Sequence, residues 1–275
     1  PVYAIVAPAV AGQFGPDMKP EKIRPAFQAL GFEDVIEVAV GADLCTIEEA
    51  KDFMKEVPEE LPFMATSCCP AWSMMAKKLF PEQAKCISMA LTPMVLTARL
   101  IKQQNPDCKI VFVGPCAAKK LEASRKTIRS YVDFVLTFEE LQGMFDAKGV
   151  DFKELPDGEP LMQASSDGRG FAASGGVAAA VVNAIRRMEP NREVKVVSAE
   201  GLANCKKMLQ LAKAGTYNGY LLEGMACPGG CIAGAGTIQP IKKTAASLEQ
   251  MKKQAPFEES MDTVYDAMLP ILEKL

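Results

Sequence analysis

The chain has 275 residues, of which 49% are hydrophobic, and its formal net charge is -3. This length and composition allow a substantial core, in one large domain or in two lobes. Lysine and arginine are spread along the chain and form no basic stretch, so we exclude nucleic acid as a partner. We also exclude a membrane span and a secretory signal, because the required long apolar run and basic start are missing.

Short apolar runs alternate with amphipathic segments along the chain. VYAIVAPAV precedes the helical pattern KIRPAFQALGF, DVIEVAV precedes TIEEAKDFMKEV, and PFMAT precedes WSMMAKKLF. A helical stretch covers 94–104, and further apolar runs are KIVFVG, DFVLTF, VKVVSA and GYLLEG. We expect a helix and a surface loop in 137–160 and a helical tail in two pieces after 242.

This alternation predicts an α/β fold with largely parallel sheets flanked by helices. The helix at 94–104 interrupts the strands, so we expect a first lobe at 1–105 and a second at 106–241. Residues 242–275 would form a helical segment that packs on both lobes. The chain opens on Pro1 without an initiator methionine and enters an apolar strand at once, from which we expect a fragment or a processed form.

The chain contains nine cysteines and no histidine. Catalysis by a Ser/His/Asp or Cys/His set is therefore excluded, as is zinc bound by histidine. Cysteine must supply any soft-ligand metal site. An odd cysteine count without a secretory signal argues against a disulfide framework and predicts reduced thiols in the cytoplasm.

Five cysteines directly follow predicted strands. Cys68 and Cys69 precede a proline suited to the first turn of a helix, and Cys116 lies at another strand-to-helix junction. Cys227 and Cys231 flank Pro-Gly-Gly just past a third strand. Ligands gather beyond the carboxyl ends of parallel strands, so these cysteines are expected to share one cleft. Four thiolates match a cubane iron-sulfur cluster, and the glycines would let the backbone approach inorganic sulfur.

Other interpretations of the cysteines remain open at this point. A redox-active disulfide is one, although such motifs usually have two residues between the cysteines, where CPGGC has three. A zinc site of four thiolates is another, although structural zinc usually takes its ligands from two closely spaced pairs. The remaining four cysteines are expected to be buried core thiols: Cys45, Cys86, Cys108 and Cys205.

Three motifs resemble those of the catalytic domain of iron-iron hydrogenases: TSCCPAW (66–72), GPCAAKK (114–120) and EGMACPGGCIAGAG (223–236). APAV (7–10), GADLCTIEEA (41–50), SGGVAAA (174–180) and EGLANCKKML (200–209) are also similar to the family, so the likeness covers nearly the whole chain. The resemblance implies two lobes with the hydrogen-activating cluster in the cleft between them.

The resemblance also implies roles for individual residues. A cubane, the 4Fe-4S part of the cluster, would be held by Cys69, Cys116, Cys227 and Cys231. Cys231 would bridge to a diiron subsite that carries carbon monoxide, cyanide and a bridging dithiolate amine. Cys68 would exchange protons with that amine, Lys119 would contact a cyanide, and Met225 would line the subsite. Without the motifs, Lys119 would be interpreted as a solvated lysine and Met225 as a core methionine.

A proton path is implied as well, through Glu49, Asp52 and Ser88. Glu49 and Asp52 are three residues apart and would share a helix face, for which an ordinary solvated surface is the competing interpretation. The chain departs from the family at several positions, which leaves the outer relay steps and the packing near the diiron subsite open. These positions are Ala9, Glu56, Pro93, Met94 and Gly114.

The sequence has no second set of closely spaced cysteines for an accessory cluster. Electrons would come from a ferredoxin-like carrier or from an N-terminal iron-sulfur domain outside this chain, and hydrogenase maturation factors would also be partners. We expect a cytoplasmic enzyme that interconverts hydrogen with protons and electrons. Two alternatives are a hydrogen sensor of the same fold and an iron-sulfur scaffold protein without the diiron subsite.

Overall fold

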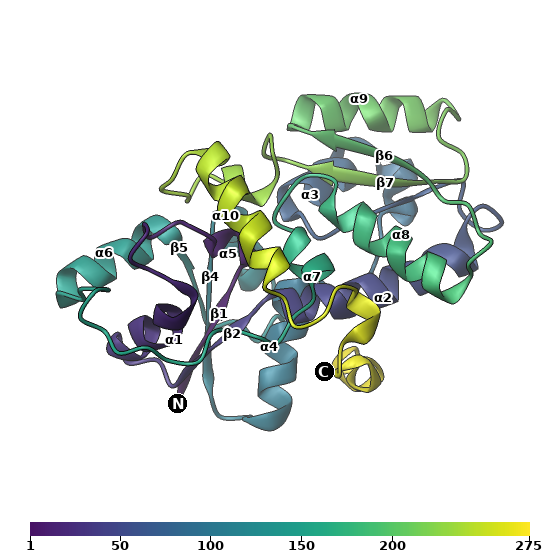
Figure 1. Ribbon diagram of the computed structural model, residues 1–275. Coiled ribbons are helices and arrows are strands. Elements are labelled where there is room, and N and C mark those ends of the chain that lie inside the picture. Colours follow the sequence, from purple (N-terminus) through teal and green to yellow (C-terminus); the bar gives the residue numbers. More distant parts are fainter.

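A computed structural model describes all 275 residues and contains two parallel sheets (Figure 1). The first sheet has the order β2-β1-β4-β5, formed by Asp34–Glu37, Val2–Val6, Lys109–Gly114 and Phe134–Thr137. The second has the order β3-β7-β6, formed by Met64–Ala65, Tyr220–Met225 and Lys195–Glu200. Every strand pair is parallel, which confirms the predicted α/β class.

Helices cover both sheets. They are α1 (Pro20–Ala29), α2 (Ala39–Glu56), α3 (Pro70–Leu79), α4 (Pro93–Gln104), α5 (Ala118–Ser124), α6 (Phe138–Lys148), α7 (Ser166–Gly170), α8 (Gly176–Met188), α9 (Leu202–Lys213), α10 (Ile241–Lys253) and α11 (Leu269–Leu272). The expected helix at 94–104 is α4, the one expected in 137–160 is α6, and α10 and α11 form the tail. None of these helices combines the length and the apolar character needed to cross a membrane.

The two sheets do not divide the chain at residue 105. Strands β1 and β2 precede that residue, yet they share a sheet with β4 and β5, which follow it. Strand β3 also precedes residue 105 but pairs with β7 at the far end of the chain. The expected boundary is corrected accordingly. Hydrophobic periodicity identifies strands, but it carries no information about which strands pair.

Helix α2 lies between the two sheets and connects them (Figure 1). It packs against α4 beside the first sheet, against α8 beside the second, and against α7. Most of its residues are buried, including the polar residues Asp43, Thr46 and Glu49. A helix with so little exposed surface places polar groups inside the protein, where each needs a hydrogen-bond partner.

Asp43 is one of these buried polar residues. Its carboxylate accepts hydrogen bonds from the Ser165 N–H at 2.9 Å and from the Ser260 hydroxyl at 2.8 Å. These bonds tie α2 to the start of α7 and to the segment that precedes α11. Burial raises the pKa of Asp43 to about 7, although the bonds from Ser165 and Ser260 lower it.

The raised pKa of Asp43 predicts a pH dependence of stability. A carboxyl whose pKa is higher in the folded state favours folding at low pH, and this contribution is lost as the pH rises through about 7. The slope is at most about 1.4 kcal/mol per pH unit. Asp43→Asn removes the titration, so its unfolding free energy should fall less between pH 5 and 7 than that of the wild type. Urea unfolding at several pH values tests this, and parallel pH profiles would contradict it.

Candidate metal centre

A mostly apolar cavity lies between the carboxyl ends of the two sheets. Its wall includes Ala7, Pro8 and Ala9 after β1, Phe112 and Pro115 around the end of β4, and Met225 at the end of β7. Met225 is one of six predicted site residues that line the cavity, and the other five are Cys68, Cys69, Cys116, Lys119 and Cys231. Strand ends from both sheets thus bring three distant motifs to one place.

Cys227 lies close to this group, although it does not line the cavity itself. Burial raises the pKa of Cys227, and the nearby Cys116 and Cys69 raise it further. All nine cysteines are free thiols. The four expected core thiols are buried, as predicted: Cys45, Cys86, Cys108 and Cys205.

Two of the cysteines precede helices. Cys69 is the N-cap residue of α3, and Pro70 occupies the first turn as the sequence predicts. Cys116 stands two residues before α5. Neither helix has a side-chain cap, so the first N–H groups of each lie beside a cysteine. Such N–H groups stabilise negative charge, which suits thiolates and anionic sulfide.

Glycines allow the cysteine motifs to approach one another closely. A side chain at Gly224 would overlap the indole ring of Trp72, whose Nε1 donates to the Thr66 carbonyl at 2.9 Å. This contact joins the 66–72 motif to the 223–236 motif. A Cβ at Gly234 would lie 2.5 Å from the Pro115 carbonyl oxygen, so a second close contact joins the 223–236 motif to the 114–120 motif.

The residues present fit an iron-sulfur cluster. Burial raises the pKa of Cys68 and of Cys231 well above the usual range for a thiol, so bound cations would be needed to stabilise a thiolate at Cys231. No three acidic, histidine or cysteine side chains converge closely enough to hold one metal ion. Four thiols brought together from strand ends of both sheets are the donor set of a cubane, in which each thiolate binds a different iron.

The Lys119 side chain is only 12% exposed, which contradicts its interpretation as a solvated lysine. Its Nζ donates to the Cys68 carbonyl at 3.4 Å and forms an ion pair with Glu122 at 2.6 Å. Burial lowers the pKa of Lys119, but the adjacent Glu122 raises it more, so the ammonium form is retained. Thr92 in turn donates to Glu122 at 2.7 Å. Sequence reasoning missed Glu122 and Thr92, although the i,i+3 spacing of Lys119 and Glu122 was a usable signal.

Glu49 is fully buried, so the interpretation as a solvated surface is wrong for this residue. Its carboxylate accepts the Ser67 N–H at 3.4 Å, next to Cys68. Burial raises the pKa of Glu49 to about 8, although the Ser88 hydroxyl and the Ser67 N–H lower it. The structure therefore places Glu49 beside Ser88 and beside Ser67, the residue that precedes Cys68.

Asp52 lies farther out on α2 and is partly exposed. Burial raises its pKa, and the negative charge of Glu56 raises it further. Glu273 in the C-terminal segment acts on Asp52 in the same direction. Lys55 lowers the pKa of Asp52, so both acidic and basic groups lie near the outer end of the predicted proton path.

The departure at Gly114 has a structural reason. A Cβ at this position would lie 2.6 Å from the ring of Phe112 and 3.1 Å from Cβ of Ala7. The Phe112 ring therefore occupies the space of a longer side chain at 114. Pro93 and Met94 also line the cavity, so these departures change its apolar wall and leave the cysteines in place.

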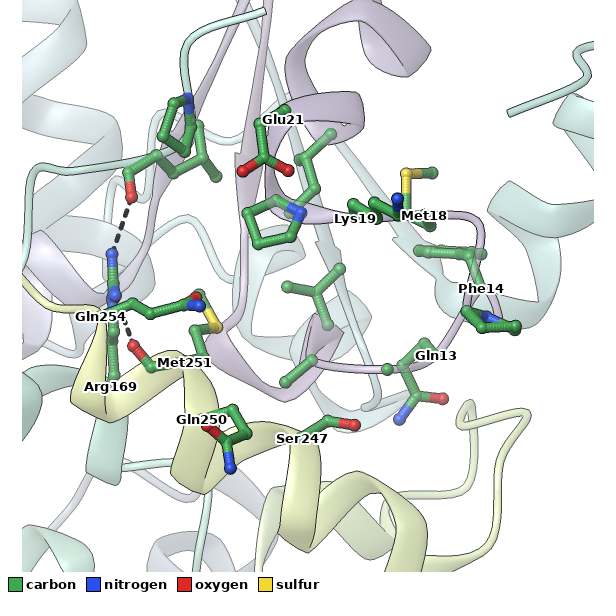
Figure 2. Close-up of a pocket in the computed structure, with 18 of the residues that line it drawn as sticks. Gln13, Phe14, Met18, Lys19, Glu21, Arg169, Ser247, Gln250, Met251 and Gln254 are labelled. Atoms are coloured by element: carbon green, nitrogen blue, oxygen red, sulfur yellow. Dashed lines mark hydrogen bonds between the residues drawn. The ribbon is translucent and has the colours of Figure 1, made fainter. Parts of the chain in front are cut away.

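A larger cavity, of about 620 Å³, lies elsewhere (Figure 2). It is lined by the 10–23 segment, by 160–162 and by one side of α10, and no cysteine reaches it. Figure 2 shows one of its charged side chains, Arg169, donating to main-chain carbonyls. The same guanidinium pairs with the buried Glu37 at 2.8 Å. Its hydrogen-bonding capacity is therefore used within the protein, and three of the four cysteines predicted to hold the cubane line the smaller cavity.

Residues 1–235 match the family of the iron only hydrogenase large subunit, C-terminal domain. Together with the fold and the three cysteine motifs, this match shows that the chain belongs to that family. A solved variant of the [FeFe]-hydrogenase HydA1 from Chlamydomonas reinhardtii has the same fold, with a TM-score of 0.79 at 23% identity. The aligned part covers 98% of this chain and 88% of that one.

The relatives include hydrogenases and proteins of another kind. Iron hydrogenase 1 of Clostridium pasteurianum is 31% identical over 86% of this chain and 50% of its own length. The periplasmic [Fe] hydrogenase large subunit of Nitratidesulfovibrio vulgaris is 31% identical over 80% and 62%. Cytosolic iron-sulfur assembly component 3 of Bos taurus is 26% identical over 84% and 60%. The chain thus spans between half and two thirds of these relatives.

The contact between Gly224 and Trp72 predicts a sharp effect of a single methyl group. In Gly224→Ala, the new Cβ would overlap the indole ring, so we expect a loss of about 1–3 kcal/mol in unfolding free energy. Iron uptake on reconstitution should fall as well, because two cysteine motifs separate.

Gly143→Ala is the matched control for this substitution. Gly143 lies within α6 and has no atom near the position of a Cβ, so alanine should stabilise the protein by roughly 0.5–1 kcal/mol. Denaturant unfolding and iron determination check both variants. Unchanged stability and iron uptake in Gly224→Ala would contradict the role of this contact.

Proposed function

We propose that this chain is the catalytic domain of an iron-iron hydrogenase, which interconverts hydrogen with protons and electrons. The observation that carries this proposal is the position of Cys68. It lines the same cavity as three of the four proposed cubane cysteines but is not itself needed to hold a cubane. A mostly buried lysine contacts its carbonyl, and a buried glutamate contacts the preceding residue. A protein that only holds a cubane needs none of these groups.

We assign the cubane to Cys69, Cys116, Cys227 and Cys231. Cys68, Lys119, Met225 and Cys231 line the same cavity and would hold the diiron subsite. When bound, this cluster supplies the metal site at which hydrogen is split or formed. The chain itself supplies the shape of the cavity, the fixed charges and the route for protons.

Cys68 is proposed as the residue that gives and takes the proton at the cluster. A thiol can serve as an acid and a base near neutral pH more readily than an alcohol. Glu49 and Ser88 lie behind it and would continue the route, with Asp52 nearer to solvent. Proton transfer needs groups within hydrogen-bond reach or joined by single waters.

Lys119 and the apolar wall have different roles in the proposal. Lys119 presents a buried ammonium group, held in place by Glu122, that suits an anionic cyanide ligand. Met94, Phe171 and Met225 contribute apolar surface that would exclude bulk water from the cavity. Exclusion of water strengthens electrostatic interactions at the site.

Electron supply and maturation require partners. We propose a ferredoxin-like electron carrier, or an iron-sulfur domain in the same protein, together with maturation factors that deliver the diiron subsite. The curated hydrogenases that match the chain are longer than the matched region, which is consistent with additional domains. A cytoplasmic location stays a prediction, since the names of the relatives include both cytosolic and periplasmic proteins.

A second candidate function is a role in iron-sulfur cluster assembly. It is supported by the match to cytosolic iron-sulfur assembly component 3. In that case the cysteines would hold a cubane without a diiron subsite, and Cys68 would have no catalytic part. Substitutions at the two adjacent cysteines distinguish these functions.

In the hydrogenase account, Cys68→Ala should keep its iron while hydrogen evolution falls by about 100-fold or more, because a proton-transfer group is lost. Cys69→Ala should lose iron and activity together, because a cubane ligand is removed. Iron determination and hydrogen evolution from a reduced dye measure both effects in matured protein.

Cys108→Ala is the control, since this buried thiol lies outside the cavity. It should retain both iron and turnover. Equal loss of iron in the Cys68 and Cys69 variants would contradict the division of roles, and so would full turnover in Cys68→Ala.

A further inference from the structure

We infer that Glu223 is a positioning residue that fixes the Cys227–Cys231 turn through the start of α8. The inference rests on the proposed function only in taking Cys227 and Cys231 as cluster ligands. Glu223 lies on β7, four residues before Cys227, and is fully buried. No lysine or arginine pairs with it. A buried carboxylate without a counter-charge is costly unless hydrogen bonds compensate it.

The start of α8 provides those hydrogen bonds. One carboxylate oxygen of Glu223 accepts the Gly175 N–H at 2.7 Å, and the other accepts the Ala178 N–H at 2.7 Å. The N-cap residue of α8 is Gly175, which has no side chain to cap the helix. Glu223 therefore caps α8 from a neighbouring strand, and its negative charge is favoured by the helix dipole.

The residues just before α8 hold the cysteine turn. Ser174 N–H donates to the Gly229 carbonyl at 3.2 Å, and Ile232 N–H donates to the Ala172 carbonyl at 3.0 Å. A Cβ at Gly230 would lie 2.5 Å from the Ser174 nitrogen, so the two backbones are in direct contact. The segment 172–174 thus supports the turn from one side along its length.

These contacts form a closed path through the structure. Glu223 holds the start of α8, α8 holds segment 172–174, and that segment holds the turn that carries both cysteines. Ala172, at the beginning of the segment, and the preceding Phe171 also line the cysteine cavity. Release of α8 from Glu223 would therefore loosen one wall of the cavity and the turn at the same time.

Glu223→Gln tests this role with little change in shape. The amide keeps one acceptor oxygen but places an NH₂ group where the second oxygen accepted an N–H, so one end of the contact is lost. Hydrogen exchange of the protein without cluster should become at least tenfold faster in peptides that cover 172–178 and 228–232. After reconstitution of the cubane, iron release to a chelator should also become at least tenfold faster.

Two further variants make the test specific. Phe145→Leu alters the aromatic cluster beside the first sheet, and it should lower stability without changing local exchange at 172–178 or iron release. Glu223→Asp keeps the charge but shortens the side chain, so both rates should be intermediate. It is also the milder variant if the glutamine variant folds poorly.

The outcomes separate this inference from the proposed function. Wild-type rates in Glu223→Gln, or effects no larger than those of Phe145→Leu, would overturn the positioning role. A wild-type protein that takes up no iron would contradict the proposed function instead. In that case the exchange rates of the cluster-free protein still decide whether Glu223 holds the turn.

Discussion

Close backbone contact at glycines is the constraint on which the candidate site depends. The cysteines follow strands of two different sheets. Side chains at three nearby glycines would keep the segments that carry these cysteines apart. Gly224 admits the Trp72 ring, Gly234 admits the Pro115 carbonyl, and Gly230 admits the backbone at Ser174. Each glycine loses more conformational entropy on folding than any other residue, because it is so free in the unfolded chain. Its repeated use here indicates that backbone proximity around the cysteines matters more than local stability.

The same compact arrangement determines where charge can lie. Glu49 lies on the buried helix α2 and has few polar partners. Lys119, in contrast, retains its charge because Glu122 lies beside it. The cavity is thus lined by cysteines and by one lysine, and a buried carboxyl group lies beside the segment that carries Cys68. In the proposed function, the cysteines would hold the cluster, while Cys68 and Glu49 would serve proton transfer. A simple iron-sulfur carrier has no need for the second set of groups.

Much of the fold and the candidate site followed from local sequence patterns. Alternating apolar and amphipathic runs predicted the parallel strands and helices, and the position of Cys69 before Pro70 predicted the start of α3. Strand order did not follow, since the pairing of β3 with β7 joins segments more than a hundred residues apart. The burial of Lys119, and its pairing with Glu122, likewise depends on packing between distant elements. Local patterns do not report such long-range contacts.

Family membership alone leaves the chemistry undecided, because relatives include both hydrogenases and iron-sulfur assembly components. The two groups should differ in the contents of one cavity. The most direct test is infrared spectroscopy of this protein after production with hydrogenase maturation factors. The account predicts carbonyl and cyanide stretching bands, which report a diiron subsite beside the cubane. A protein with a full complement of cubane iron but neither set of bands after competent maturation would contradict it.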